Sequence, residues 1–222
     1  MARLARLVVP GLPHHITQRG NRRQKTFFTD QDYEHYINLM ARQCLSQNVD
    51  IWAYCLMPNH VHLIAVPKSV EALRLAIGEG HRRYTKFVNL RQDWRGHLWQ
   101  GRFASFVLDD AHLLEAVRYI ELNPIRAGLA RKPEAYQWSS ARAHITGKAD
   151  RLVKPSSLDH MVGDWRQFLN QKMSKNCPTD LRRHERTGRP LGSDAFIKKL
   201  EELSGRRLRC QQAGRKKKDI DK

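Results

Sequence analysis

Residues 51–66 read IWAYCLMPNHVHLIAV, and this stretch decides the fold. Two runs rich in apolar, β-branched and aromatic residues, 50–57 and 60–66, flank a Pro-Asn turn, which predicts a β-hairpin. Side chains two apart on a strand share a face, so His60 and His62 are expected to point the same way. Two imidazoles on one rigid strand can begin a metal site. On local grounds alone, a pair of structural histidines is the commoner outcome.

Strand and helix patterns lie on both sides of this hairpin. Residues 12–19 and 102–108 are expected strands. Apolar residues recur at helical spacing over 30–47 and 70–91, and a further helix is expected from Asp109 or Asp110 through Ile120. The order βαββαβ followed by an added helix is typical of a ferredoxin-like α+β fold.

Two adjacent histidines open the first expected strand. His14 and His15 point to opposite faces there, so at most one of them can approach a metal at the hairpin. Structural roles for both are favoured.

The texture of the chain changes near residue 147, which predicts two units, 1–147 and 148–222. Residues 151–222 carry 19 Lys and Arg against nine Asp and Glu. Helices are expected over 158–173 and 193–203, so this unit is a small, basic, helical appendage. Its end, residues 215–218, is a basic run that is either simply solvated or in contact with phosphates.

Charge narrows the class of partner. The 222 residues hold 40 Lys and Arg against 22 Asp and Glu, a net charge of +18. Such an excess indicates a polyanionic partner, with nucleic acid favoured over a membrane surface because no basic amphipathic helix has a clean apolar face. No long apolar segment is present, and the apolar patch near residue 8 is too short for a signal peptide core. A cytoplasmic protein is expected.

A second motif, AVRYIELNPIRAGL, occupies residues 116–129. Tyr119 and Asn123 are four apart and share a face if the helix is continuous. A phenol beside a cation held by two histidines would be a nucleophile. Locally, a packing role for Tyr119 and an N-cap role for Asn123 before Pro124 are the favoured alternatives.

Basic residues gather in two places, at residues 19–23 and 82–86. Both patterns suit a protein that binds single strands by neutralising phosphates and stacking bases. For the second cluster the alternative is a solvated helix face, with Tyr84 in the core.

Three strings together resemble a known family. MPNHVHL (57–63) and YIELNPIRAGL (119–129), with TQRGN (17–21), resemble the HUH single-tyrosine transposases and, more closely, the REP-associated tyrosine transposases, a domesticated bacterial branch. TGRPLGSDAFIKKLEELSGRRL (187–208) is similar to that branch's C-terminal appendage. The resemblance runs from about residue 10 to about residue 210. Mobile relatives usually carry Gln where this chain has Asn123, whereas REP-associated members are expected to use Asn.

The resemblance implies a reaction and a site. His60, His62 and the amide of Asn123 would hold Mg²⁺ or Mn²⁺, and Tyr119 would attack the scissile phosphate to give a 5′-phosphotyrosine. The partner would be single-stranded DNA with palindromic hairpins, in the bacterial cytoplasm at the nucleoid, and the protein a monomer or a homodimer. DNA contacts are assigned to Arg19, Asn21, Arg22, Arg23, Arg82, Arg83, Lys86 and Arg126. A noncatalytic nucleic-acid-binding regulator and a hydrolytic metal-dependent nuclease remain alternatives.

Overall fold

A four-stranded antiparallel sheet forms the centre of the protein. The computed structural model describes residues 5–154 and 156–209. The strands are β1 (His14–Arg19), β2 (Val49–Met57), β3 (His60–Pro67) and β4 (Ala104–Val107), and they lie in the order β2-β3-β1-β4. Helix α1 (Asp30–Ser46) joins β1 to β2, and α2 (Glu79–Gln92) lies between β3 and β4. The predicted βαββαβ order and ferredoxin-like α+β class are confirmed.

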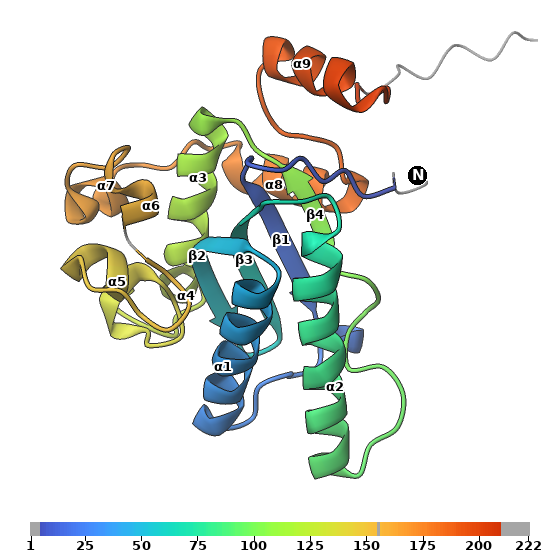
Figure 1. The fold of residues 1–222 in the computed structure, drawn as a ribbon. Helices are drawn as coiled ribbons and strands as arrows, with labels where there is room; N and C mark the ends of the chain where they lie inside the picture. The colour runs from blue at the N-terminus through green and yellow to red at the C-terminus, as the bar shows by residue number, and fades with distance from the viewer. Residues whose placement is uncertain (1–4, 155, 210–222) are drawn as a thin grey trace, which may run out of the picture.

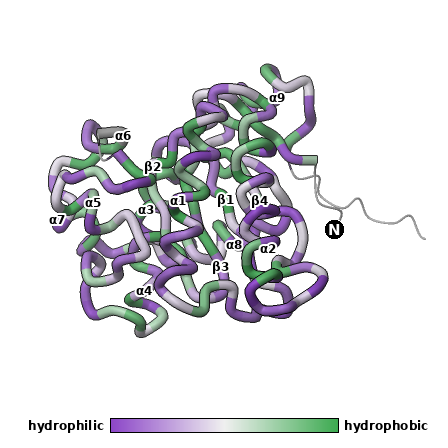
Figure 2. Tube along the Cα trace, turned by 60° about the horizontal axis from the view of Figure 1, so that its bottom comes forward, coloured by the Kyte–Doolittle hydropathy of each residue, from purple (hydrophilic) through white to green (hydrophobic). Residues whose placement is uncertain are grey.

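The two faces of the sheet are covered by different helices (Figure 1). Helices α1 and α2 cover one face, where Val61 and Leu63 of β3 join their core cluster. Helix α3 (Asp110–Glu121) covers the other, where Ile64 lies in a second cluster. Figure 2 shows many of the hydrophobic residues in the central strands, with mostly hydrophilic loops around them. The hairpin therefore alternates between two separate cores, as its period of two requires.

The helix expected over 70–91 begins later and is irregular. A π-helical turn, η2 (Arg74–Gly78), precedes α2. Tyr84 is fully buried on α2 and its hydroxyl donates to the carbonyl of Thr26 at 2.7 Å, so the core role for this residue is confirmed.

Short helices make up the rest of the chain. They are η1 (Asn21–Arg23), α4 (Asn123–Arg126), η3 (Pro133–Ala135), α5 (Ala141–Thr146), α6 (Ser156–Asp159), α7 (Trp165–Asn170), α8 (Cys177–Thr187) and α9 (Asp194–Ser204). The single helix expected over 158–173 is wrong: Asp164 caps the start of α7, its carboxylate accepting from the N–H groups of Arg166 and Gln167. The helix expected over 193–203 matches α9, which Ser193 caps.

The C-terminal helices pack on the first 147 residues at two places. Residues from α6, α7 and α8 share the hydrophobic cluster of α3, and Leu200 of α9 packs with Leu7 and Val107. The division of the chain at residue 147 stays a prediction, and the basic run 215–218 lies outside the described residues.

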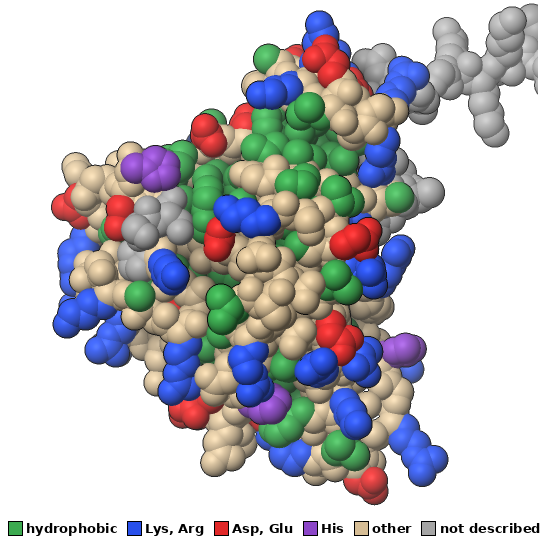
Figure 3. Space-filling view, viewed as in Figure 1, with side chains coloured by type: hydrophobic (Ala, Val, Ile, Leu, Met, Phe, Trp, Pro, Cys, Tyr) green, Lys and Arg blue, Asp and Glu red, His purple; other side chains and the backbone are tan. Residues whose placement is uncertain are grey.

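The surface is rich in cations. Figure 3 shows Lys and Arg side chains spread over this face of the molecule, with fewer acidic side chains between them. Of the helices in the described residues, none combines the length and the apolar character needed to span a membrane.

Candidate active site

Four predicted site residues come together on the α3 face of the sheet. The rings of His60 and His62 lie 5.0 Å apart between centroids, and the ring of Tyr119 lies 5.9 Å from that of His62. The amide nitrogen Nδ2 of Asn123 is 3.5 Å from Nε2 of His60. Strand β3, helix α3 and helix α4 thus each bring a functional group to one place.

The helix that carries Tyr119 ends before Asn123, so the two residues do not lie on one continuous helix. α3 ends at Glu121, and α4 begins at Asn123 with Leu122 as the capping residue. Leu122 takes part in helical hydrogen bonds on both sides of the break, since its N–H donates to the carbonyl of Arg118 and its carbonyl accepts from the N–H of Arg126. The spacing is therefore kept. Leu122, not Asn123, is the capping residue of α4, and the Asn123 side chain contacts His60 and Arg126.

Hydrogen bonds fix which nitrogen each histidine presents. Nδ1 of His60 lies 2.6 Å from Oδ1 of Asn59, so the ring donates there and Nε2 keeps its lone pair. Nδ1 of His62 lies 3.1 Å from Nε2 of His15. Each histidine of the pair therefore has its Nδ1 engaged, while Nε2 of His60 faces the Asn123 amide and Nε2 of His62 takes no part in the contact with His15. Partner groups orient metal-binding histidines in the same way.

Burial keeps these imidazoles neutral. Burial, with a smaller effect of Arg19, lowers the pKa of His60 to about 3. Burial, with the neighbouring His60 and His15, holds the pKa of His62 well below its usual range. Only the neutral form has a lone pair to offer a cation, so both histidines are ready to bind one at neutral pH.

Strand β1 contributes a residue that sequence reasoning undervalued. His15 was expected to be structural, but its ring stacks on that of His62 with 5.3 Å between centroids. The β1–β3 register also sets Thr17 opposite His62 and Arg19 opposite His60. The alternation of β1 puts these three residues on one face, and their proximity to the hairpin depends on the pairing of β1 with β3.

Arg126 lies against the tyrosine. Its guanidinium carbon is 4.0 Å from the centre of the Tyr119 ring, and Nη2 donates to the carbonyl of Tyr119 at 2.8 Å and to Oδ1 of Asn123 at 3.3 Å. A cation over the ring face is favoured by the ring quadrupole. The residue predicted to touch DNA therefore also contacts Tyr119 and Asn123.

Two buried charged residues that sequence reasoning missed anchor the tyrosine helix. Arg118 donates from Nε to the carbonyl of Phe168 and from Nη2 to Gln171, both at 2.9 Å. On the other side, Oε1 of Glu121 accepts from Ser140 and pairs with Nδ1 of His144, both at 2.6 Å. Helix α3 is thus held to α7 and to the start of α5. In the sequence, the signal for these anchors was that Arg118 and Glu121 are charged residues within an otherwise apolar stretch of this helix.

The basic turn after β1 lies beside the hairpin. Nδ2 of Asn59 donates to the carbonyl of Arg23 at 3.1 Å. Gly20 is needed at the turn because a Cβ there would lie 2.3 Å from the Gln24 carbonyl oxygen. Arg22 and Arg23 are exposed, so η1 places two positively charged side chains on the surface beside the hairpin.

The second basic cluster lies elsewhere. Arg82 and Arg83 are exposed on α2 and both pair with Glu79, and Lys86 is exposed on the same helix. Because α2 covers the other face of the sheet, the structure does not bring this cluster to the histidine pair.

The donor atoms of this site suit a divalent cation such as Mn²⁺ or Mg²⁺. Among the described residues, no three His, Cys, Asp or Glu side chains group together as a metal site. The set at β3 is instead two imidazoles and a carboxamide. Imidazole nitrogen with amide oxygen suits Mn²⁺ and tolerates Mg²⁺, so the residues present fit the expected group.

Comparison with known proteins gives the chain its family. Residues 8–123, more than half of the chain, match the model of the family "Transposase IS200 like". A comparison with curated proteins finds no match. A solved structure of a REP-associated tyrosine transposase bound to a REP hairpin is similar, with a TM-score of 0.53 and 18% identity over 68% of this chain and 90% of that one. A crystal structure of a putative transposase from Deinococcus radiodurans aligns with a TM-score of 0.39 and 21% identity over 54% of this chain and 96% of that one. The segment matched by the family model includes β1, the histidine pair, Tyr119 and Asn123, and the chain belongs to the IS200-like transposase family.

Proposed function

We propose that this transposase nicks and rejoins single-stranded DNA at palindromic hairpins, with Tyr119 as its nucleophile. One observation carries the proposal: two imidazole rings, a carboxamide and a phenol converge on one face of the sheet from three separate elements. A packing role for Tyr119 would not require two histidines and a carboxamide beside it. The similar REP-associated enzyme, solved with a REP hairpin, supports the choice of substrate.

His60, His62 and Asn123 would hold Mg²⁺ or Mn²⁺ at their Nε2 and amide oxygen atoms. A half-turn of the Asn123 amide brings Oδ1 to the position that Nδ2 takes beside His60. The bound cation would supply positive charge to a nonbridging oxygen of the scissile phosphate. His15 and Asn59 contact the two imidazoles and would hold them in the orientation that binding needs.

Tyr119 then acts on the phosphorus. A bond forms between its phenolic oxygen and phosphorus while the bond from phosphorus to the 3′ oxygen breaks. The phenol gives up one proton and the leaving oxygen takes one up, which yields a 5′-phosphotyrosine and a free 3′-OH. Because one phosphodiester replaces another, a second 3′-OH can reverse the step without ATP. Arg126 over the ring, and the anchors of α3 at Arg118 and Glu121, hold the nucleophile in place.

The whole set comes from one chain, which supports action as a monomer. A homodimer that exchanges the tyrosine helix is the alternative, and it would have to release both anchors of α3. Acting on chromosomal palindromes, the protein would work at the nucleoid of a bacterial cytoplasm.

The test is adduct formation. Single-stranded hairpin oligonucleotides, labelled at either end, are incubated with Mn²⁺ and the protein and then separated on denaturing gels. We expect a covalent 5′-linked adduct that Tyr119→Phe loses and the matched control Tyr136→Phe keeps, since the Tyr136 hydroxyl donates to the Leu56 carbonyl and interacts with the Tyr33 hydroxyl. Cleavage with no adduct at any time point would support the hydrolytic nuclease. Binding without cleavage on every hairpin would support the regulator.

A further inference from the structure

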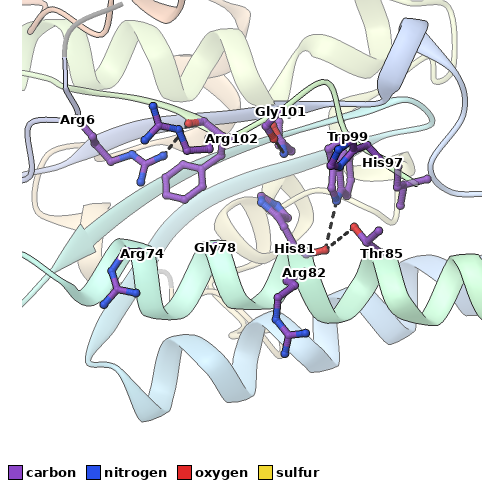
Figure 4. A pocket seen from close by; sticks show the side chains of 13 residues that line it. Arg6, Arg74, Gly78, His81, Arg82, Thr85, His97, Trp99, Gly101 and Arg102 are labelled. Atoms are coloured by element: carbon purple, nitrogen blue, oxygen red, sulfur yellow. Dashed lines mark hydrogen bonds between the residues drawn. The ribbon is translucent and has the colours of Figure 1, made fainter. Parts of the chain in front are cut away.

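Two cavities of similar volume have different linings. One, of about 490 Å³, lies between α2 and the segment that leads into β4, and the rings of Trp99 and Phe103 form part of its wall (Figure 4). The other is a cleft of about 480 Å³ between the end of α1, the start of β2 and residues 151–154. None of the described residues that line this cleft is aromatic. The cleft therefore offers no ring on which a nucleic-acid base could stack.

The floor of the cleft is apolar. Cys44, Val49 and Ile51 line it, are buried, and belong to the core cluster of the α1 and α2 face. Leu45 lies at the rim and is 82% exposed, more than any other large hydrophobic side chain in the described residues. A single exposed leucine is ordinary on a protein surface, but this one extends an apolar cleft. Together they form a surface that another apolar side chain can cover.

Positive charge surrounds this apolar surface. Arg42, Arg151 and Lys154 line the cleft and are exposed. None of the three forms an ion pair with an acidic side chain in the described residues. The acidic residue in the lining, Asp50, is paired with Lys68 at 3.2 Å. The cleft therefore has three cations to which a ligand could bring carboxylates.

Hydrogen bonds hold the wall opposite α1 in place. The carboxylate of Asp150 accepts from the N–H groups of Leu152 and Val153, both at 2.7 Å, and from the hydroxyl of Tyr54 at 2.8 Å. Val153 also pairs with Ile51 at the edge of the sheet. The cleft is thus formed without a partner, and a preformed site lowers the entropic cost of binding.

We infer that this cleft docks an acidic segment of a protein partner. One aliphatic side chain of the segment would pack beside Leu45, and its carboxylates would lie on Arg42, Arg151 and Lys154. An apolar anchor in a pocket with charged contacts around it is the usual composition of a peptide-binding site. A nucleic-acid strand would match the cations but leave the apolar floor unused.

The cleft lies far from the histidine pair. It opens at the start of β2, where Val49 pairs with Pro67, whereas Met57 at the other end of the strand pairs with His60. The strand between Val49 and Met57 is roughly 25 Å long. A partner in the cleft therefore leaves the reaction centre open to DNA, and the inference goes beyond the proposed function without depending on it.

Two exposed leucines give a matched pair of variants. Leu45 on α1 is 82% exposed and Leu90 on α2 is 74% exposed, and Leu90 does not line the cleft. Leu45→Ser removes the apolar rim without opening the core, because the side chain is already largely solvated. Leu90→Ser makes the same change outside the cleft, so both variants should fold as the wild type does.

The experiment measures the binding of fluorescein-labelled peptides to the full chain by fluorescence anisotropy. The probes have equal length and are a glutamate peptide with central leucines, the same peptide with serine for leucine, and a lysine peptide with central leucines. Wild type and Leu90→Ser should bind the Glu-Leu peptide about tenfold more tightly than the Glu-Ser peptide, the effect of burying part of a leucine side chain. Neither should bind the Lys-Leu peptide. Leu45→Ser should bind the two acidic peptides equally.

A second pair of variants tests the cations. Arg42→Ala with Lys154→Ala should weaken binding of both acidic peptides about fivefold, because two ion pairs are lost. Lys198→Ala with Lys199→Ala removes the same charge on α9, outside the cleft, and should leave both affinities unchanged. Equal losses in the two double variants would mean that the acidic peptides respond to net charge alone, and would overturn the inference.

Other outcomes also overturn it. Equal wild-type affinity for the Glu-Leu and Glu-Ser peptides, no binding of either, or an unchanged preference in Leu45→Ser would each do so. A loss of single-stranded DNA affinity in Leu45→Ser but not in Leu90→Ser would assign the cleft to DNA. Self-association that Leu45→Ser abolishes, measured by analytical ultracentrifugation, would assign it to a second copy of the chain. Adduct formation by Leu45→Ser at the wild-type rate reports on the proposed function separately.

Discussion

Each face of the sheet carries a buried histidine that has one ring nitrogen engaged by a neighbouring side chain. On the α3 face, His15 engages one nitrogen of His62 and leaves the other free. On the α1 and α2 face, Tyr36 engages one nitrogen of His81 and leaves the other free. The difference lies in what the covering segment brings: α3 carries a phenol and leads to a carboxamide, whereas η2 and α2 bring Gly78, Arg74 and Arg82 to the lining of a cavity. The histidines of the α3 face thus belong to the proposed reaction centre, whereas His81 lines a cavity.

The largest expected effect is loss of chemistry on one face only. His62→Ala removes an imidazole from the reaction centre and should lower adduct formation by roughly a thousandfold or more, with DNA affinity kept. His60→Ala should do the same. His81→Ala, on the opposite face, should form adduct normally at saturating DNA. Single-turnover assays at saturating DNA make the comparison. If His60→Ala or His62→Ala forms the adduct at the wild-type rate, that histidine has no role in the mechanism.

The next effect separates the two neighbouring histidines of β1. His15→Phe keeps the ring stack but leaves Nδ1 of His62 without its partner, and such changes commonly cost about ten- to a hundredfold in metal affinity or activity. The Mn²⁺ concentration needed for half-maximal adduct formation should rise, and high Mn²⁺ should restore the rate. His14→Phe, on the other face, is the control. Equal Mn²⁺ requirements in the two variants would leave His15 with a packing role only.

Acid should destabilise the protein through its buried histidines. Burial lowers the pKa of His81 to about 3, against 6.5 in the unfolded chain. The unfolded chain then binds more protons between these values, so the free energy of unfolding is greatest above pH 6.5 and falls as pH drops toward 3. One such histidine accounts for about 2 kcal/mol between pH 6.5 and 5. Urea unfolding at several pH values measures the slope, which His81→Gln should reduce. A slope unchanged in that variant would mean that other groups carry the acid sensitivity.

The smallest effect concerns the basic turn beside the hairpin. Arg22→Ala with Arg23→Ala should weaken DNA binding about tenfold and lower the slope of log affinity against log salt by about 2, because two phosphate contacts are lost. Lys198→Ala with Lys199→Ala on α9 removes the same charge at a distance from the turn (Figure 1). Equal slopes in the two double variants would indicate a general effect of net charge.

Much of the fold could be predicted from the sequence. The alternation of residues 60–66 put His60 and His62 on one face, and the order of elements gave the ferredoxin-like sheet. The prediction of one helix over 158–173 was wrong because the apolar spacing gave no sign that the chain leaves the helical conformation before Asp164. The helix expected through Ile120 matches α3, whereas the spacing of Tyr119 and Asn123 could not decide whether the helix continues to Asn123, since it is the same with and without a break.

The sequence by itself determined the features that depend on local periodicity: which side chains share a face, where most helices begin, and the strong positive charge. Backbone geometry fixes these within a few residues, so they can be read from spacing. Only the tertiary structure decided that His15 supports His62, that Arg118 and Glu121 anchor the tyrosine helix, and that His81 lines a cavity. Each of these contacts joins residues from elements that are remote along the chain, and it exists because packing and strand register bring those elements together.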